Sequence, residues 1–293
     1  MKVIITIPAY NEEITLPKVL KEINTVMSKT KYNYQIMVFD DGSKDKTKQV
    51  AKAHGAIVRG NTRNRGLAIT FRNEMAECVK QKADIIVHTD ADGQYPAIFI
   101  PKLIKKVEEG YDLVLGSRFK GKNRYAGSVF KNLGNVAFAK VFSNMTKTKL
   151  TDTTTGFRAF TREVAEEISF INTFTYTQEQ IIRASKQNFK LAEIPITPRR
   201  TRESRLFRNP LEYAFRAWIN IFRIYRDYEP IKFFGKIGLT IGGIGFIFGI
   251  WLVYLFFTTG NVGHIPTTIL SLLLLTTGIQ IVLFGFLADM QNK

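Results

Sequence analysis

Short apolar runs alternate with amphipathic helical patterns through the first 116 residues of the chain. The runs have the length and the Val, Ile and Phe content of strands, and the segments between them repeat apolar residues at the spacing of a helix. The predicted strands are 2–7, 35–39, 56–59, 85–89, 113–115 and 191–196, and the predicted helices are 13–28, 45–54, 67–82, 98–109, 128–144 and 178–186. This alternation predicts an α/β unit in which helices cover a parallel sheet.

Two long segments near the C-terminus, 237–257 and 265–288, contain no charged residue. Each exceeds the roughly 20 residues that a helix needs to cross the hydrocarbon core of a bilayer. They predict a two-helix transmembrane hairpin, and the alternative is a buried helix pair of a soluble protein. Before them, segment 211–225 has apolar residues at spacings of three and four. It predicts an amphipathic helix, lying either at the membrane interface or on the soluble part.

The formal net charge of +17 is compatible with nucleic acid or with anionic lipid as a partner. Basic residues concentrate at 199–208 and continue to Lys236, directly before the first apolar segment, whereas the connecting segment 258–264 has no Lys or Arg. This asymmetry favours a membrane surface and places both termini on the cytoplasmic side. Cys78 is the single cysteine, so an intramolecular disulfide is excluded.

An acidic motif, Asp90-Ala91-Asp92-Gly93-Gln94, closes one of the predicted strands. Alternate residues of an extended chain share a face, so Asp90, Asp92 and Gln94 can present three oxygen donors together. Such donors suit Mg²⁺ or Mn²⁺, which complete their coordination with water and substrate phosphates. The alternative is that the two aspartates only cap the following helix. Polar segments 10–12 and 40–43 follow two other strands at the same end, where parallel sheets bind ligands.

Four motifs in order closely resemble the inverting family 2 glycosyltransferases: Pro8-Ala9-Tyr10-Asn11-Glu12-Glu13, Asp40-Asp41-Gly42-Ser43, Asp90 to Pro96, and Gly116-Ser117-Arg118. Segments 152–160 and 203–206, followed by the hairpin, narrow the resemblance to dolichyl-phosphate mannose synthases and related polyprenyl-phosphate sugar transferases. It implies a GT-A-like nucleotide-sugar-binding domain with a mainly parallel sheet over residues 1–206. It further implies a basic juxtamembrane segment with interfacial amphipathic helices, 207–234. A transmembrane hairpin with a short cytoplasmic tail, 235–293, would come after it.

The resemblance also implies roles for individual residues. Those that would bind the nucleotide sugar are Pro8, Tyr10, Glu12, Phe39, Asp41, Asp90, Ala91, Asp92 and Gln94. Asp90, Asp92 and Gln94 would hold Mg²⁺ or Mn²⁺. Without the family pattern, Pro8 would be a strand-ending residue and Tyr10 a packed aromatic at the rim.

Four basic residues would contact phosphate by the same resemblance: Arg118, Lys131, Arg199 and Arg205. The catalytic set would be Asp92, Arg118 and Asp152. A surface salt bridge is the alternative for Arg118, and Asp152 either orients the reacting groups or caps the turn before Gly156. The chain departs from the family pattern at Arg202, where a glycine is usual, and at Arg205, where a lysine is usual.

We therefore expect a membrane-bound enzyme that transfers one sugar, with inversion, from GDP-mannose or UDP-glucose to polyprenyl (dolichyl-type) phosphate at the cytoplasmic face of the cell membrane. A phosphate acceptor is already ionised and requires no general base. The Gln-x-x-Arg-Trp motif of processive synthases is absent, which favours transfer of a single sugar. The alternatives are a transferase that uses a glycan or protein hydroxyl, a membrane-anchored nucleic-acid-binding protein and a catalytically silent nucleotide-sugar sensor. The oligomeric state stays open.

Overall fold

The computed structural model describes residues 1–120, 139–140, 142–168, 176–199, 219, 222–223, 225–261 and 264–291. The chain divides into two compact units, Met1–Pro210 and Leu211–Lys293. Lys131, Arg202 and Arg205 lie outside the described residues, as do most of the predicted helices 128–144 and 211–225. The predicted domain boundaries after residues 206 and 234 stay predictions.

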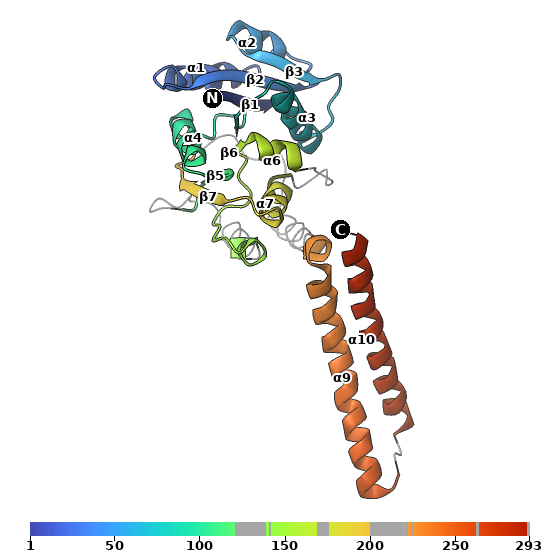
Figure 1. Ribbon diagram of the computed structural model, residues 1–293. Coiled ribbons are helices and arrows are strands. Elements are labelled where there is room, and N and C mark those ends of the chain that lie inside the picture. The colour runs from blue at the N-terminus through green and yellow to red at the C-terminus, as the bar shows by residue number, and fades with distance from the viewer. Residues whose placement is uncertain are drawn as a thin grey trace. The chain divides into compact units, whose positions relative to one another are not determined.

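The first unit is built on a seven-stranded sheet with the order β3-β2-β1-β4-β6-β5-β7 (Figure 1). The strands are β1 (Lys2–Ala9), β2 (Asn33–Asp41), β3 (Ile57–Asn61), β4 (Ile85–His88), β5 (Leu113–Ser117), β6 (Arg158–Thr161) and β7 (Leu191–Pro195). All neighbours are parallel except β6, which runs antiparallel to both β4 and β5. The predicted α/β class with a mainly parallel sheet is therefore confirmed. β6 was not predicted, because its sequence, Arg-Ala-Phe-Thr, is polar at both ends and contains no apolar run.

Helices connect and cover these strands (Figure 1). They are α1 (Leu16–Met27), α2 (Thr47–Ala53), α3 (Leu67–Lys80), the 3₁₀ turn η1 (Ala97–Phe99), α4 (Ile100–Glu108), α6 (Arg162–Glu167) and α7 (Tyr176–Lys186). Helix α1 begins at Leu16, three residues after the predicted start at Glu13. Helix α6 was not predicted, since six residues show no helical period; its start is capped by the Thr161 hydroxyl, which accepts the Val164 N–H.

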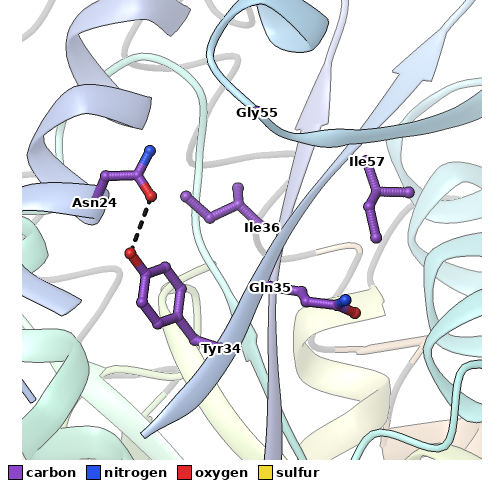
Figure 2. A pocket seen from close by; sticks show the side chains of 6 residues that line it. All are labelled: Asn24, Tyr34, Gln35, Ile36, Gly55 and Ile57. Atoms are coloured by element: carbon purple, nitrogen blue, oxygen red, sulfur yellow. Dashed lines mark hydrogen bonds between the residues drawn. The ribbon is translucent and has the colours of Figure 1, made fainter. Parts of the chain in front are cut away.

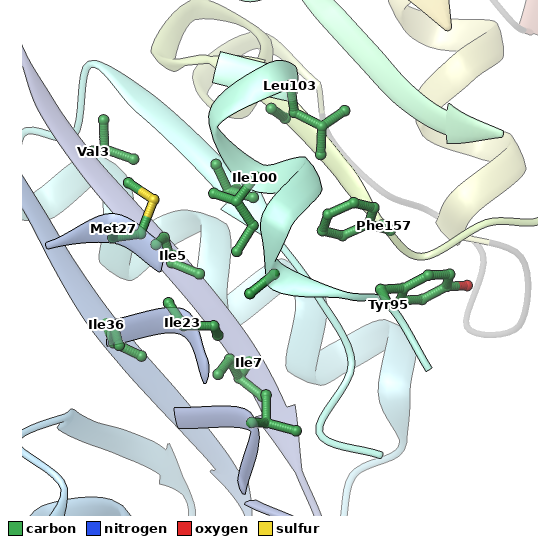
Figure 3. Packing of buried hydrophobic residues seen from close by; sticks show 14 of the residues in the cluster. Val3, Ile5, Ile7, Ile23, Met27, Ile36, Tyr95, Ile100, Leu103 and Phe157 are labelled. Atoms are coloured by element: carbon green, nitrogen blue, oxygen red, sulfur yellow. The ribbon is translucent and has the colours of Figure 1, made fainter. Parts of the chain in front are cut away.

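The hydrophobic core lies on one face of the sheet, where β1 packs against α1 and α4. Figure 3 shows Ile5 and Ile7 of β1 facing Ile23 of α1, with Ile100 of α4 nearby. The opposite face is polar at its centre. There Thr6 Oγ1 donates to Glu74 Oε1 of α3 at 2.9 Å. Because alternate residues of a strand point to opposite faces, β1 contributes Ile5 and Ile7 to the apolar core and Thr6 to the buried hydrogen bonds on the other side.

A pocket of about 250 Å³ opens at the amino ends of β2 and β3. Its lining residues are Asn24, Tyr34, Gln35, Ile36, Gly55 and Ile57 (Figure 2). Tyr34 Oη donates to Asn24 Oδ1 at 3.1 Å across one side of it. The pocket lies at the strand ends opposite to the polar motifs, so it is separate from the candidate site described below.

The second unit contains two helices, α9 (Pro230–Thr259) and α10 (Ile265–Gln291), that are long and apolar enough to cross a membrane. Most of their side chains face outward, and Leu239 and Phe257 are 73% and 81% exposed. Glycines let the two backbones approach closely: a Cβ on Gly278 would lie 2.6 Å from the Gly242 nitrogen and 2.7 Å from the Gly238 oxygen. Small residues at a helix contact are characteristic of helix pairs in lipid.

The start of α9 is covered by two residues of the predicted amphipathic segment. The rings of Phe222 and Tyr225 lie 4.6 Å and 5.9 Å from the Phe233 ring, both edge-on. These are two of the residues that the helical spacing placed on the apolar side of that segment. Its location at the membrane interface stays a prediction.

We expect Gly278→Leu to separate α9 from α10, because no side chain fits between Gly278 and the α9 backbone. The measurement is the distance between spin labels on the two helices in detergent micelles or bilayers, and it should lengthen and broaden. Gly243→Leu is the matched control, since a Cβ there has nothing within 4 Å. An unchanged distance in Gly278→Leu would show that the glycine contact does not hold the hairpin.

Candidate active site

The loops that follow β1 and β2 are joined to each other by side-chain hydrogen bonds. The Asn11 N–H donates to Ser43 Oγ, the Lys44 N–H donates to Asn11 Oδ1, and the Glu12 N–H donates to Thr47 Oγ1, each at 2.9 Å. Asn11 adopts a left-handed conformation with φ of 55°, which asparagine tolerates better than most residues. The two sequence motifs therefore form one continuous rim at the carboxyl ends of β1 and β2.

The residues predicted to bind the base and ribose lie along this rim. Pro8 of β1 and Phe39 of β2 are buried register partners, and Tyr10, two residues after Pro8, is 37% exposed. Glu12 is buried, and its Oε2 accepts the Thr15 hydroxyl at 2.6 Å. The exposed ring of Tyr10 thus offers a flat surface to a ligand, while its neighbours shape the strand ends beneath.

Asp41 organises the loop between β3 and α3. Its Oδ1 accepts hydrogen bonds from Asn61 Nδ2 at 2.7 Å and from the Arg65 N–H at 2.9 Å, and its Oδ2 accepts the Gly66 N–H at 2.9 Å. A Cβ on Gly42, which has a φ of +75°, would collide with the Arg63 backbone at 2.6 Å. Asp41 therefore has a clear structural role, and its predicted contact with the nucleotide stays a prediction.

The acidic motif follows β4 as a tight turn. Asp92 Oδ1 accepts the Gln94 N–H at 2.9 Å, and Gly93 takes the left-handed conformation with a φ of +75°. Neither η1 nor α4, the two helices that follow, has a side-chain cap. The alternative that the aspartates cap the next helix therefore has no support in the geometry.

The Asp90 carboxylate is pressed against the turn before β6. A Cβ on Gly156 would lie 3.0 Å from Asp90 Oδ1 and 3.3 Å from Oδ2. Burial raises the pKa of Asp90 to about 6; His88 and Arg118 lower it, whereas Asp92 raises it further. Two neighbouring carboxylates, one of them partly buried, are a place where a divalent cation is favourable.

The donor set fits Mg²⁺ or Mn²⁺, which proteins commonly hold with one or two carboxylates while water and substrate phosphates complete the coordination. Asp90 and Asp92 are the candidate ligands. Among the residues that the structure describes, no three His, Cys, Asp or Glu side chains gather in a way that could hold a metal ion. The third predicted ligand, the Gln94 amide, stays a prediction.

Arg118 and Asp152 form a buried ion pair next to this turn. Arg118 Nε donates to Asp152 Oδ2 at 2.7 Å, and Nη2 donates to Oδ1 at 2.9 Å and to Thr154 Oγ1 at 2.7 Å. The Arg118 N–H also donates to Oδ2, at 3.1 Å. Burial alone would lower the pKa of the guanidinium, but Tyr95 and Asp152 raise it above its ordinary value. Arg118 is therefore in a salt bridge, as the alternative held, but the pair is largely buried and not on the surface. Its predicted contact with phosphate stays a prediction.

Arg199 was predicted to contact phosphate, and in the structure it pairs with a carboxylate. Its Nη1 and Nη2 donate to Glu22 Oε2 at 2.6 Å and Oε1 at 2.9 Å. Oε1 of the same carboxylate accepts the Ala97 N–H at 3.0 Å, and the Arg199 N–H donates to the Gln94 carbonyl at 2.8 Å. Hydrogen bonding from Arg199 lowers the pKa of Glu22. Arg199 is thereby joined to the acidic motif through its own N–H, and Glu22 joins it to the start of η1.

Sequence reasoning missed Glu22, Arg158 and Glu193. Arg158 of β6 is fully buried, and it donates to the Thr177 carbonyl at 3.0 Å, to Gln180 Oε1 at 2.9 Å and to the Thr155 carbonyl. It lies within segment 152–160, which the sequence did single out. Glu22 and Glu193 gave no local signal, because their partners are distant in the sequence.

Comparison with known proteins identifies the fold and its relatives. The family model of glycosyl transferase family 2 matches residues 4–169. A dolichyl-phosphate hexose transferase of Haloferax volcanii is 30% identical over 188 residues, which cover 64% of this chain and 78% of the relative. A bactoprenol glucosyl transferase of Shigella phage SfX is 26% identical over 295 residues, which cover 99% and 93%.

Among solved structures, glucosyl-3-phosphoglycerate synthase from Mycobacterium tuberculosis, in complex with Mn²⁺, uridine diphosphate and phosphoglyceric acid, matches with a TM-score of 0.60. The match covers 76% of this chain and 77% of that one at 21% identity. At this identity the likeness shows the fold, and it confirms the predicted GT-A-like class.

We expect Gly156→Ala to weaken metal binding by about 10-fold, the lower end of the range for disturbing the support of a metal ligand. The new methyl group would push the Asp90 carboxylate out of place. Manganese titration followed by electron paramagnetic resonance measures the affinity, and Gly243→Ala, where a Cβ has open space, is the control. Equal affinities in the two variants would contradict a role of Asp90 in holding the metal.

Proposed function

This chain belongs to glycosyl transferase family 2, and from that premise we propose that it transfers one sugar from a nucleotide sugar to polyprenyl phosphate, with inversion. The proposed donors are GDP-mannose and UDP-glucose, and the proposed location is the cytoplasmic face of the cell membrane. The chain is a glycosyltransferase, and relatives named for transfer to dolichyl phosphate and to bactoprenol support a lipid-phosphate acceptor.

The bonding of Asp152 is the observation that carries the choice of acceptor. A hydroxyl acceptor must lose its proton to a general base, whereas a phosphate oxygen is already ionised at neutral pH. Asp152 is 1% exposed. Its Oδ1 accepts from Arg118 and Thr154, and its Oδ2 accepts twice from Arg118. A carboxylate held in this way is poorly placed to take a proton, which supports phosphate over the glycan or protein hydroxyl.

Arg118 would supply positive charge to the donor diphosphate or to the acceptor phosphate. The sequence suggested that its planar fork binds two phosphate oxygens. In the structure, Nε and Nη2 both donate to Asp152, so the proposed phosphate contact would use Nη1. Because the fork is fixed in advance, the guanidinium need not reorganise as charge develops, which is the main advantage of a preorganised site.

Asp90 and Asp92 would hold Mg²⁺ or Mn²⁺ beside the donor diphosphate. When bound, the cation would neutralise negative charge on the departing nucleoside diphosphate. The chain itself positions the two carboxylates: the turn at Gly93 directs Asp92, and the backbone at Gly156 confines Asp90. Tyr10, Pro8 and Phe39 would form the base and ribose side of the donor site.

The membrane hairpin and the distribution of charge support the proposed location. Helices α9 and α10 are long and apolar enough to span a bilayer, and basic residues precede α9, whereas residues 258–264 contain no Lys or Arg. Such a bias favours cytoplasmic placement of the segment before α9 and of the end of α10. A lipid-linked acceptor would then be delivered within the same membrane.

We expect the 293-residue chain in lipid vesicles, given Mg²⁺ or Mn²⁺, to form a lipid-linked monosaccharide from labelled GDP-mannose or UDP-glucose. Dolichyl and undecaprenyl phosphate are supplied separately, and the free polyprenols serve as hydroxyl controls that should give no product. Thin-layer chromatography and mass spectrometry identify the product.

Transfer to a free hydroxyl but to neither lipid phosphate would favour the alternative transferase. Tight, salt-dependent nucleic-acid binding without transfer would favour the non-enzymatic alternative.

Asp92→Ala should lower turnover by roughly 100-fold or more, the scale of losing one electrostatic stabiliser of a transition state, with far less effect on folding. The rate of lipid-linked sugar formation and the circular dichroism spectrum are the two measurements. Glu109→Ala, which removes a surface carboxylate paired with Lys106, is the control for loss of negative charge. Full activity in Asp92→Ala would refute the metal assignment.

A further inference from the structure

Glu193 of β7 is a buried carboxylate that faces the turn carrying Asp152. Its Oε1 accepts the N–H groups of Thr151 and Asp152 at 2.8 Å and 2.9 Å, and its Oε2 accepts the Thr151 hydroxyl at 2.7 Å. The side chain comes from 41 residues further along the chain. Burial raises the pKa of Glu193, and the three donors act against that rise.

The hydrogen bonds continue from Thr151 to the end of β5 in a fixed direction. Thr151 Oγ1 has a single proton, which it gives to Glu193, so it must accept from Ser117 Oγ at 2.6 Å. Ser117 Oγ in turn accepts the N–H groups of Phe119 and Lys120 at 3.2 Å and 3.0 Å. One chain of bonds therefore links the end of β5, the 151–152 turn and β7.

This chain of bonds lies next to both members of the buried ion pair. Ser117 directly precedes Arg118, and Thr151 directly precedes Asp152. The turn has no regular secondary structure of its own to fix it. Without Glu193, the two backbone N–H groups and the Thr151 hydroxyl would lose their acceptors in a buried place, where an unsatisfied donor is unfavourable.

We propose that Glu193 is a positioning residue of the sugar-transfer site, which holds the 151–152 turn and the end of β5 so that Asp152 fixes Arg118. The assignment rests on the proposed function. Glu193 acts through hydrogen bonds, and both of its oxygens are occupied by the turn. It therefore has no part in proton transfer.

A glutamine at position 193 separates positioning from acid–base chemistry. Its oxygen can accept the two N–H groups, and its NH₂ can donate to one lone pair of Thr151 Oγ1, whose other lone pair still accepts from Ser117. Glu193→Gln should therefore keep kcat within about threefold of the wild-type value. Glu193→Ala, which leaves all three donors without an acceptor, should lower kcat by about 10-fold or more, because small displacements of catalytic groups are costly.

Thr151 supplies an independent pair of variants in case Glu193→Ala does not fold. Thr151→Val keeps the shape of the side chain and breaks the link to Ser117, so kcat should fall while the KM for the nucleotide sugar changes by less than about threefold. Thr151→Ser restores the hydroxyl and should restore kcat. Thr148→Val, whose hydroxyl bonds only to the Thr146 carbonyl among the described residues, is the control for loss of a nearby threonine.

The experiment measures kcat and the KM for the donor in vesicles, together with circular dichroism and hydrogen exchange at the Thr151 and Asp152 amides. Exchange should accelerate in Glu193→Ala and stay slow in Glu193→Gln. The assignment is overturned if Glu193→Ala or Thr151→Val, folded, has the wild-type kcat, or if Glu193→Gln is as inactive as Glu193→Ala. A wild-type protein that transfers no sugar overturns the proposed function instead, and this assignment with it.

Discussion

The buried pair of Arg118 and Asp152 is the interaction on which the candidate site depends. Taking both charges out of water is unfavourable, and removing one partner of such a pair typically costs about 3–5 kcal/mol. Further hydrogen bonds stabilise the pair, to Thr154, from the Arg118 backbone and, through the turn, to Glu193. These bonds fix the end of β5 relative to the turn before β6. The same turn places Gly156 against Asp90. One local structure therefore fixes the positions of both the cationic and the acidic residues of the site.

Much of the fold follows from local pattern. Strands β1 to β5 and helices α1 to α4 are predicted because a parallel sheet buries both faces of its strands, and its helices need an apolar side. The hairpin is predicted because a bilayer requires long uncharged segments. Strand β6 is different: it is inserted antiparallel between β4 and β5, and its sequence, Arg-Ala-Phe-Thr, begins with an arginine that is buried only because carbonyl groups and Gln180 surround it. The pattern of apolar and polar residues near β6 does not indicate such partners.

The candidate site, like the fold, could be predicted from the sequence only in part. Its location could be predicted, because the carboxyl ends of neighbouring parallel strands meet at one edge and the polar motifs follow those strands. The contacts could not. Asp41 uses its oxygens on the loop after β3, and Arg199 binds Glu22, a partner 177 residues away. These pairings follow from the three-dimensional register of the sheet and from the path of loops, and neither is encoded in the spacing of residues along the chain.

The chemistry of the acceptor connects these observations. A site that ionises a hydroxyl needs a carboxylate or imidazole with an available lone pair near the attacking oxygen. Here the Asp152 carboxylate uses both of its oxygens in hydrogen bonds to Arg118. This geometry suits Asp152 for fixing positive charge and not for removing a proton. Fixed positive charge is useful to an acceptor that arrives as an anion, and an anionic acceptor carried by a long apolar chain would have to be met at the membrane. If the proposed function holds, the apolar hairpin and the fixed arginine meet one requirement, the binding of an anionic acceptor that is carried in the membrane.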